Sequence, residues 1–149
     1  MILLDVNVLV HAFHAASPEH AAYRAWLEAT VEGDEPFGLS ELVLSGFVRV
    51  ATHPRVFDPP APVREALAFA DALRSQPNAV IVAPGTRHLE IFEHLCMAAG
   101  AKGNLVADAY LAALAIESGC EWITGDRDFS RFPGLRWRHA RSATVLVAY

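Results

Sequence analysis

The chain opens with Met1-Ile-Leu-Leu-Asp5-Val-Asn7, an apolar run that ends in an acidic residue. A similar pattern recurs near the other end of the chain, at Trp122-Ile-Thr124-Gly-Asp126-Arg-Asp128. Short apolar runs bounded by turn residues are typical of buried strands. In an open α/β sheet, ligands bind in the crevice beyond the carboxyl ends of the strands. The two stretches therefore predict strands that deliver carboxylates to one edge of one sheet.

Two further acidic residues lie where helices are expected to begin. Glu41 follows the apolar stretch 37–39, and Asp108 lies in the first turns of a helix expected from Asn104. Carboxylates gathered at one place repel one another and resist burial as ions unless a cation joins them. Oxygen ligands of this kind suit Mg²⁺ or Mn²⁺ and not zinc or copper. These acids together predict a metal site.

Strands and helices are expected to alternate along the chain. Helix-start signals are Ser17-Pro18, Ser40 and Asn104, and Gly119 is a helix-stop signal. The expected strands lie at 1–5, up to 39, at 79–82, at 121–124 and near 135–138 and 144–148, and the expected helices at 6–15, 18–31, 40–52, 63–74, 88–99 and 104–118. This alternation implies crossover connections, an α/β fold and a small, mainly parallel sheet flanked by helices.

Composition narrows the class of protein. A length of 149 residues predicts one domain spanning residues 1–149, and 53% hydrophobic against 19% charged residues excludes disorder. The net charge of −5 argues against binding nucleic acid through bulk charge. Cys96 and Cys120 lack metal-ligand spacing, and no apolar run approaches the ~20 residues of a membrane span. We therefore expect a soluble, cytoplasmic protein that does not enter a membrane.

Three other classes with acidic or phosphate-binding pockets fit the sequence poorly. A phospho-accepting receiver domain needs a lysine at a strand end, but the only lysine, Lys102, lies in a glycine-flanked loop. A haloacid-dehalogenase-like phosphatase needs a second aspartate where Asn7 stands, and a nucleotide-binding loop needs glycines that the turn 5–8 lacks. The remaining interpretation is hydrolysis of a phosphodiester by a water that bound metal activates.

Several segments resemble a known family. The stretch 3–10 (LLDVNVLV) is similar to the opening of PIN-domain ribonucleases, 104–116 (NLVADAYLAALAI) to their third acidic motif and 124–129 (TGDRDF) to their fourth. The segment 44–57 (LSGFVRVATHPRVF) resembles a subgroup of VapC-type toxins of toxin–antitoxin pairs. The resemblance implies a PIN-like fold, a Mg²⁺-dependent endoribonuclease in which Mn²⁺ can substitute, a small cognate antitoxin and a homodimer.

The resemblance assigns catalytic roles to Asp5, Glu41, Asp108 and Asp126 and metal binding to Asp5, Asp108 and Asp126. The second shell around the metal is expected to contain Asn7, Thr124 and Asp128. One position departs from the family pattern: many members carry their second acid about six residues after the serine that corresponds to Ser40, and this chain has Gly46 there. Glu41 then either replaces that acid or only favours the helix dipole.

Other interpretations stay open at this point. A catalytically degraded PIN-like module would bind a partner without cleaving RNA, and a structure-specific DNA nuclease would use the same carboxylates. A group of arginines follows the last acidic motif and forms either a basic rim for an RNA backbone or an ordinary solvated face; these are Arg127, Arg131, Arg136, Arg138 and Arg141.

Overall fold

The computed structural model describes residues 1–140, which form an α/β fold around a five-stranded sheet. The strands are β1 (Ile2–Leu4), β2 (Phe37–Leu39), β3 (Ala79–Ile81), β4 (Glu121–Ile123) and β5 (Trp137–Arg138), in the order β3-β2-β1-β4-β5. All four neighbouring pairs are parallel, with Leu3 opposite both Gly38 and Trp122. The predicted α/β class and mainly parallel sheet are confirmed.

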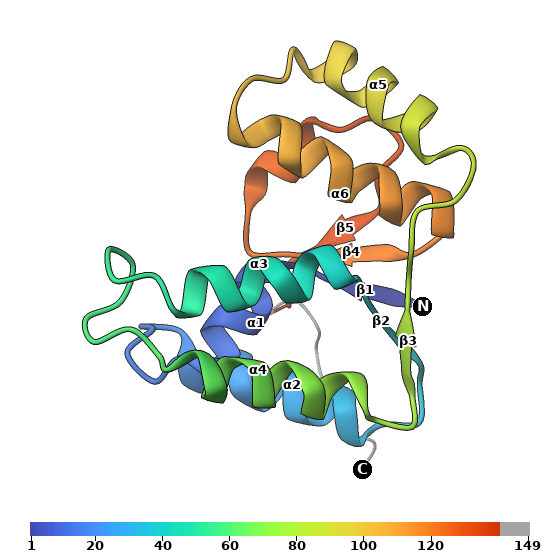
Figure 1. Ribbon diagram of the computed structural model, residues 1–149. Helices are drawn as coiled ribbons and strands as arrows, with labels where there is room; N and C mark the ends of the chain where they lie inside the picture. Colours follow the sequence, from blue (N-terminus) through green and yellow to red (C-terminus); the bar gives the residue numbers. More distant parts are fainter. Residues whose placement is uncertain (141–149) are drawn as a thin grey trace.

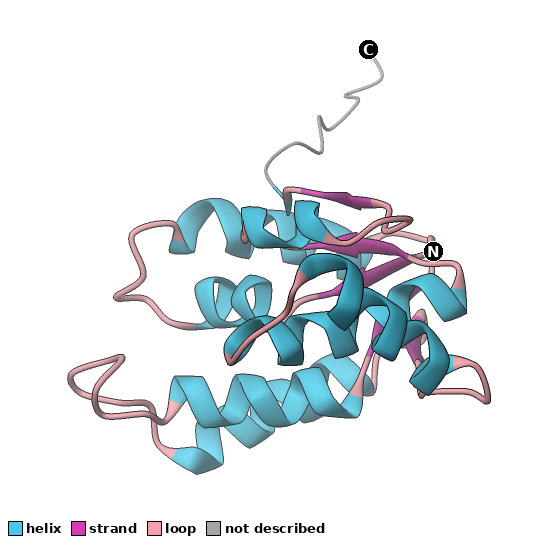
Figure 2. Ribbon diagram, turned by 90° about the horizontal axis from the view of Figure 1, so that it is seen from above, coloured by secondary structure: helices cyan, strands magenta, loops and turns pink. Residues whose placement is uncertain are grey.

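Helices cover both faces of this sheet. They are α1 (Val6–Phe13), α2 (His20–Glu32), α3 (Glu41–Ala51), α4 (Val63–Arg74), α5 (His88–Ala99) and α6 (Asn104–Ser118), with a short 3-10 helix, η1, at Arg127–Arg131. Figure 1 shows α5 and α6 stacked on one side of the sheet and α1, α2 and α4 on the other, and α3 packs against α1 and α4. Figure 2 shows the central strands among these helices, with an edge strand at the outside of the sheet.

The core lies where the central strands meet these helices. Leu3, Leu4, Phe37 and Trp122 are fully buried, because β1 and its two neighbours are covered on both faces and their runs are accordingly apolar. Phe129 is also buried and packs on Trp122, so both rings belong to the core. Within residues 1–140, no helix is long and apolar enough to cross a membrane.

Some predicted helix ends are confirmed and others are wrong. Ser40 caps α3, where its hydroxyl accepts the backbone N–H of Leu42, and Gly119 ends α6 in the left-handed conformation with φ 68°. Ser17 does not cap α2, because its hydroxyl is hydrogen-bonded to the ring of His11 and the helix begins only at His20. Asn104 is the first residue of α6 and not its cap. The strand predicted at 144–148 lies outside the described residues.

Candidate functional site

Asp5 lies at the end of the central strand and holds the start of the next helix. Its backbone N–H continues the β1–β4 pairing by donating to the carbonyl of Ile123 (3.0 Å), and its side chain caps α1 by accepting the N–H of Val6 (2.6 Å). Only 4% of the residue is exposed. A strand end and a helix cap together thus fix a carboxylate at the carboxyl edge of the sheet.

The second oxygen of Asp5 accepts hydrogen bonds from two side chains that were expected to lie around the metal ligands. It accepts the hydroxyl of Thr124 (2.6 Å) and the amide of Asn7 (2.8 Å). Asn7 also accepts the backbone N–H of Gly125 (3.0 Å), and the Thr124 oxygen accepts the N–H of Asp126 (2.9 Å). This network joins β1 to the turn after β4 and sets the position of Asp126 relative to Asp5.

The turn after β4 carries the second carboxylate. Asp126 caps η1 by accepting the backbone N–H of Asp128 with Oδ1 (2.8 Å). Gly125 has no room for a side chain, because a Cβ there would lie 2.5 Å from the hydroxyl oxygen of Tyr23. The turn is therefore packed against α2 behind it and hydrogen-bonded to Asn7 beside it, which leaves Asp126 little freedom of direction.

Asp108 lies on α6, which covers the face of the sheet opposite to α1. It is half-buried, and it lines one cavity of about 860 Å³ together with Asp5, Asn7 and Asp126. The structure thus brings together three of the four acids that the sequence analysis selected, from β1, α6 and the turn after β4.

The electrostatics of the cavity oppose a full set of negative charges. Burial is the main reason that the pKa of Asp5 rises from 3.8 to about 7; the hydrogen bonds from Thr124 and Val6 act in the opposite direction, and Asp108 and Asp126 add to the rise. Burial likewise raises the pKa of Asp108 to about 6, with contributions from Asp126 and Asp128. A cation in the cavity would relieve both effects, because it favours the ionised form of every carboxylate near it.

The donor set fits a hard cation. The cavity wall contains the carboxylates of Asp5, Asp108 and Asp126. It also contains the amide side chains of Asn7 and Asn104, and it contains no thiol. Within residues 1–140, no three His, Cys, Asp or Glu side chains lie close enough together to form a complete metal site by themselves. Mg²⁺ keeps several waters and is bound through only one or two carboxylates, so it does not require a complete protein cage.

Glu41 lies apart from these acids. It is exposed at the first position of α3 and lines a separate groove between α3 and α4, and it does not line the cavity of Asp5. Gly46, further along α3, faces α1 so closely that a Cβ there would lie 3.0 Å from a methyl carbon of Val6. A side chain at position 46 would thus require the Val6 side chain to move by a few tenths of an ångström. The role of Glu41 stays a prediction.

Among the residues that line the cavity without having been predicted there are two basic side chains, His11 and Arg49. His11 comes from α1, and its ring is hydrogen-bonded to the Ser17 hydroxyl; Arg49 comes from the last turn of α3. Their positions depend on how α1, α3 and the segment 16–18 pack together, and neither carries a local sequence signal.

The arginines after the last acidic motif behave differently, because several are bonded to their own chain. Arg131 and Arg136 donate to the carbonyls of Ala99 and Gly119, Arg138 pairs with Glu121, and Arg141 lies outside the described residues.

Comparison with known proteins agrees with this geometry. The family model described as the PIN domain matches residues 2–135. The chain belongs to the PIN-domain family. Ribonuclease VapC43 of Mycobacterium tuberculosis is 48% identical over 93% of this chain and 95% of its own length. Ribonuclease VapC25 of the same species is 40% identical over 91% and 96%. This PIN domain is accordingly a VapC ribonuclease.

Solved structures share the fold at lower sequence identity. The PIN domain matches the structure of VapBC2 from Rickettsia felis bound to a DNA fragment from their promoter, with a TM-score of 0.64 and 19% identity over 93% of this chain and 98% of the other. It also matches VapC20 of Mycobacterium tuberculosis, described as a sarcin–ricin loop cleaving toxin, with a TM-score of 0.64 and 18% identity over 91% and 99%. The predicted PIN-like fold is confirmed.

Proposed function

We propose that this VapC ribonuclease is a Mg²⁺-dependent endoribonuclease, in which Mn²⁺ can substitute, and that its reaction takes place in the cavity of Asp5, Asp108 and Asp126. One observation supports this most strongly. The three acids come from separate elements, and two of them have raised pKa values because they share a partly buried cavity. Crowding of this kind costs stability in the metal-free chain, and acids with strongly perturbed pKa values in a cleft are candidates for a functional site.

Each residue has a distinct role in this proposal. Asp5, Asp108 and Asp126 would hold the cation, which would supply an activated water and stabilisation of negative charge on the leaving oxygen. Thr124 and Asn7 orient Asp5 through their hydrogen bonds. Asp128 adds negative charge beside Asp108, and its N–H fixes one oxygen of Asp126.

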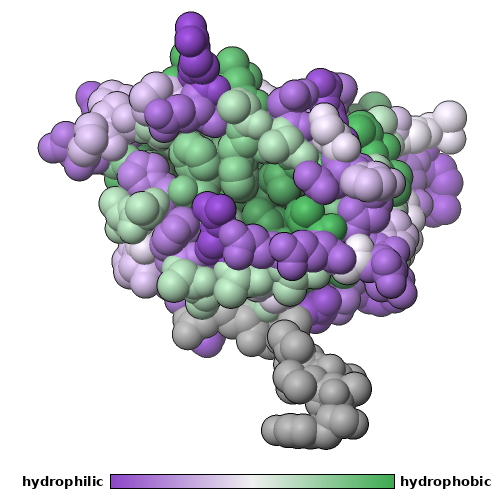
Figure 3. Space-filling view, turned by 90° about the horizontal axis from the view of Figure 1, so that it is seen from below, coloured by the Kyte–Doolittle hydropathy of each residue, from purple (hydrophilic) through white to green (hydrophobic). Residues whose placement is uncertain are grey.

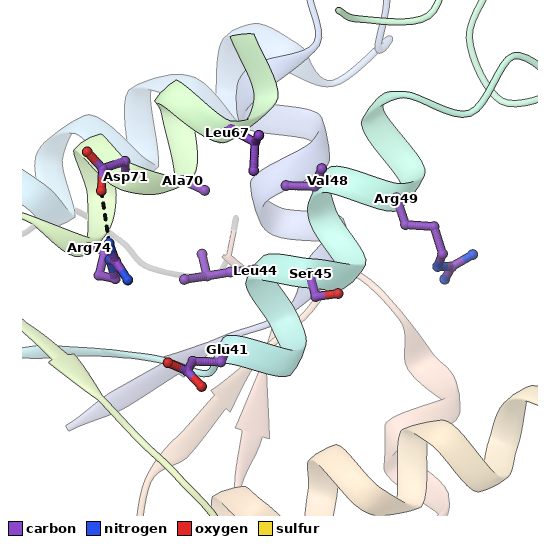
Figure 4. Close-up of a pocket in the computed structure, with 9 residues that line it drawn as sticks. All are labelled: Glu41, Leu44, Ser45, Val48, Arg49, Leu67, Ala70, Asp71 and Arg74. Carbon is purple, nitrogen blue, oxygen red and sulfur yellow. Dashed lines mark hydrogen bonds and ion pairs between the residues drawn. The ribbon is translucent and has the colours of Figure 1, made fainter. Parts of the chain in front are cut away.

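We also propose that the cognate antitoxin binds in the groove between α3 and α4. This groove encloses about 710 Å³, and its wall is largely apolar, with Leu44 and Val48 from α3 facing Leu67 and Ala70 from α4 (Figure 4). Leu67 is half-exposed. Figure 3, seen from the side of α2 and α4, shows a different face, on which hydrophobic residues are gathered with hydrophilic ones around them. An amphipathic helix that lays its apolar face in a groove is a common mode of recognition.

The groove adjoins the acidic cavity, because Arg49 lines both. A segment seated in the groove can therefore extend a cationic side chain to Asp5 and Asp108, where it would compete with the metal. We further propose that two copies of the chain form a closed dimer, the commonest arrangement among oligomers.

Cleavage of purified RNA tests the function. Wild-type protein is incubated with total RNA and, separately, with single- and double-stranded DNA, in Mg²⁺ and in EDTA, and the new RNA ends are sequenced. We expect discrete cuts in RNA only when Mg²⁺ is present, and none with Asp108→Asn. Cleavage in EDTA at the same rate would refute the metal dependence, and cleavage of DNA alone would refute the substrate class. A shift of the melting temperature by Mg²⁺ without cleavage of any substrate would identify a degraded module.

A further inference from the structure

We propose that Arg49 is a substrate-positioning residue, which holds a phosphate of the RNA backbone at the mouth of the acidic cavity. The inference rests on the function proposed above and adds the group that attracts the substrate. The metal ligands cannot do this alone, since they carry the same sign of charge as RNA. A phosphate next to the one that is cleaved needs a fixed cation near the site.

The charges on the cavity wall leave one candidate for that cation. Four carboxylates line the cavity, those of Asp5, Asp58, Asp108 and Asp126. Among the described residues that line it, Arg49 is the only lysine or arginine. Burial lowers the pKa of His11, which disfavours the charged form of its ring.

The guanidinium of Arg49 makes no polar interaction within the described chain. In residues 1–140 it forms no ion pair and donates no hydrogen bond, although Asp58 lines the same cavity. Arg49 is exposed in the last turn of α3, and Figure 4 shows its side chain extending away from Glu41 and Arg74, which lie at the other end of the groove. By contrast, Arg74 pairs with Asp71, and Arg131, Arg136 and Arg138 are bonded to their own chain.

The chemistry of a guanidinium matches this position. Its planar donors bind a phosphate through two parallel hydrogen bonds, and it stays charged at every working pH. A phosphate contact fixes the register of a nucleic acid without reading its bases. Arg49 is therefore suited to place a backbone over Asp5 and Asp108, while the choice of sequence is made elsewhere.

The test compares three variants on one substrate, an RNA oligonucleotide that spans the strongest cut mapped in the wild-type reaction. Arg49→Ala removes the contact, Arg49→Lys keeps the charge without the paired donors, and Arg64→Ala is the control. Arg64 is an exposed arginine in the first turn of α4 that does not line the acidic cavity, so its loss changes the net charge equally. Melting temperatures confirm that each variant is folded.

We expect Arg49→Ala to raise KM about tenfold, which corresponds to ~1.4 kcal/mol, with kcat changed far less. The KM of Arg49→Lys should lie between that of Arg49→Ala and that of the wild type. The slope of log(1/KM) against log salt should become shallower by about 0.7 in Arg49→Ala, the value for one lost contact to single-stranded RNA, and should stay unchanged in Arg64→Ala.

Other results would overturn the inference. If Arg49→Ala matches Arg64→Ala in KM and salt dependence while the wild type cleaves RNA, Arg49 does not bind the backbone and the proposed function stands. If Arg49→Ala weakens only the binding of the antitoxin, the guanidinium serves the partner instead. If the wild type cleaves no RNA, the proposed function fails, and the inference fails with it.

Discussion

The buried carboxylate of Asp5 makes the stability of the metal-free chain depend on pH. A carboxyl whose pKa is 3.8 when unfolded and about 7 when folded binds its proton more tightly in the folded chain. The contribution of Asp5 to stability is therefore most favourable at low pH and becomes less favourable as pH rises from 3.8 through 7. Integrating between pH 5 and pH 8, Asp5 alone should lower the free energy of unfolding by about 2.5 kcal/mol.

The measurement is urea unfolding in EDTA at pH 5 and pH 8, for the wild type and Asp5→Asn. The variant has no ionisable group at this position. When the pH is raised from 5 to 8, its free energy of unfolding should therefore decrease by about 2.5 kcal/mol less than that of the wild type. The raised pKa of Asp108 and the lowered pKa values of His11 and His14 also contribute, with opposite signs. They are present in both proteins, so the difference between the proteins reports Asp5 together with its interaction with Asp108 and Asp126.

Asp58→Asn is the matched control. Asp58 lines the same cavity but is exposed, so removing its charge should leave the wild-type pH dependence unchanged. The reasoning is refuted if wild type and Asp5→Asn lose the same free energy between pH 5 and pH 8. It is also refuted if Asp58→Asn reduces the loss of free energy between pH 5 and pH 8 as much as Asp5→Asn does.

Four further outcomes are expected. Saturating Mg²⁺, at about 100 times its Kd, should stabilise the wild type by about 2.7 kcal/mol at pH 8, raising its melting temperature, and should stabilise Asp5→Asn much less; equal shifts in calorimetry would contradict the assigned ligands. Asp108→Asn should lower kcat for RNA cleavage more than 100-fold, about 2.7 kcal/mol, whereas Glu41→Gln, outside the cavity, should lower it less than tenfold; equal losses would return Glu41 to the metal site. Gly125→Ala should destabilise the fold by about 1–3 kcal/mol in urea unfolding because its Cβ meets the Tyr23 hydroxyl, and Tyr23→Phe should relieve part of that loss; additive effects would count against the contact. Light scattering should give twice the chain mass of 16.2 kDa at micromolar concentrations, and a single-chain mass throughout would exclude the dimer.

The local signals in the sequence predicted most elements correctly, because each depends on a few neighbouring residues. The run Ile2–Leu4 with Asp5, the cap at Ser40 and the stop at Gly119 all appear in the structure as predicted. The signal at Ser17 failed because its hydroxyl is hydrogen-bonded to the ring of His11, a contact made only once α1 and the following turn have packed. Such a contact outweighs a helix-cap preference worth about 1 kcal/mol.

The carboxylates at the two strand ends were placed by the sequence itself, since a parallel sheet brings strand ends to a common edge. Asp5 and Asp126 are therefore neighbours for a reason that the pattern already contains. Glu41, Arg49 and Gly46 are different, because their relation to the cavity depends on the rotation and the distance of α3 against α1. The sequence determined which acids could meet at the edge of the sheet. Only the tertiary structure decided that α3 brings Arg49 and not Glu41 to the cavity, because the direction in which a helix presents its side chains is set by packing between elements far apart in the chain.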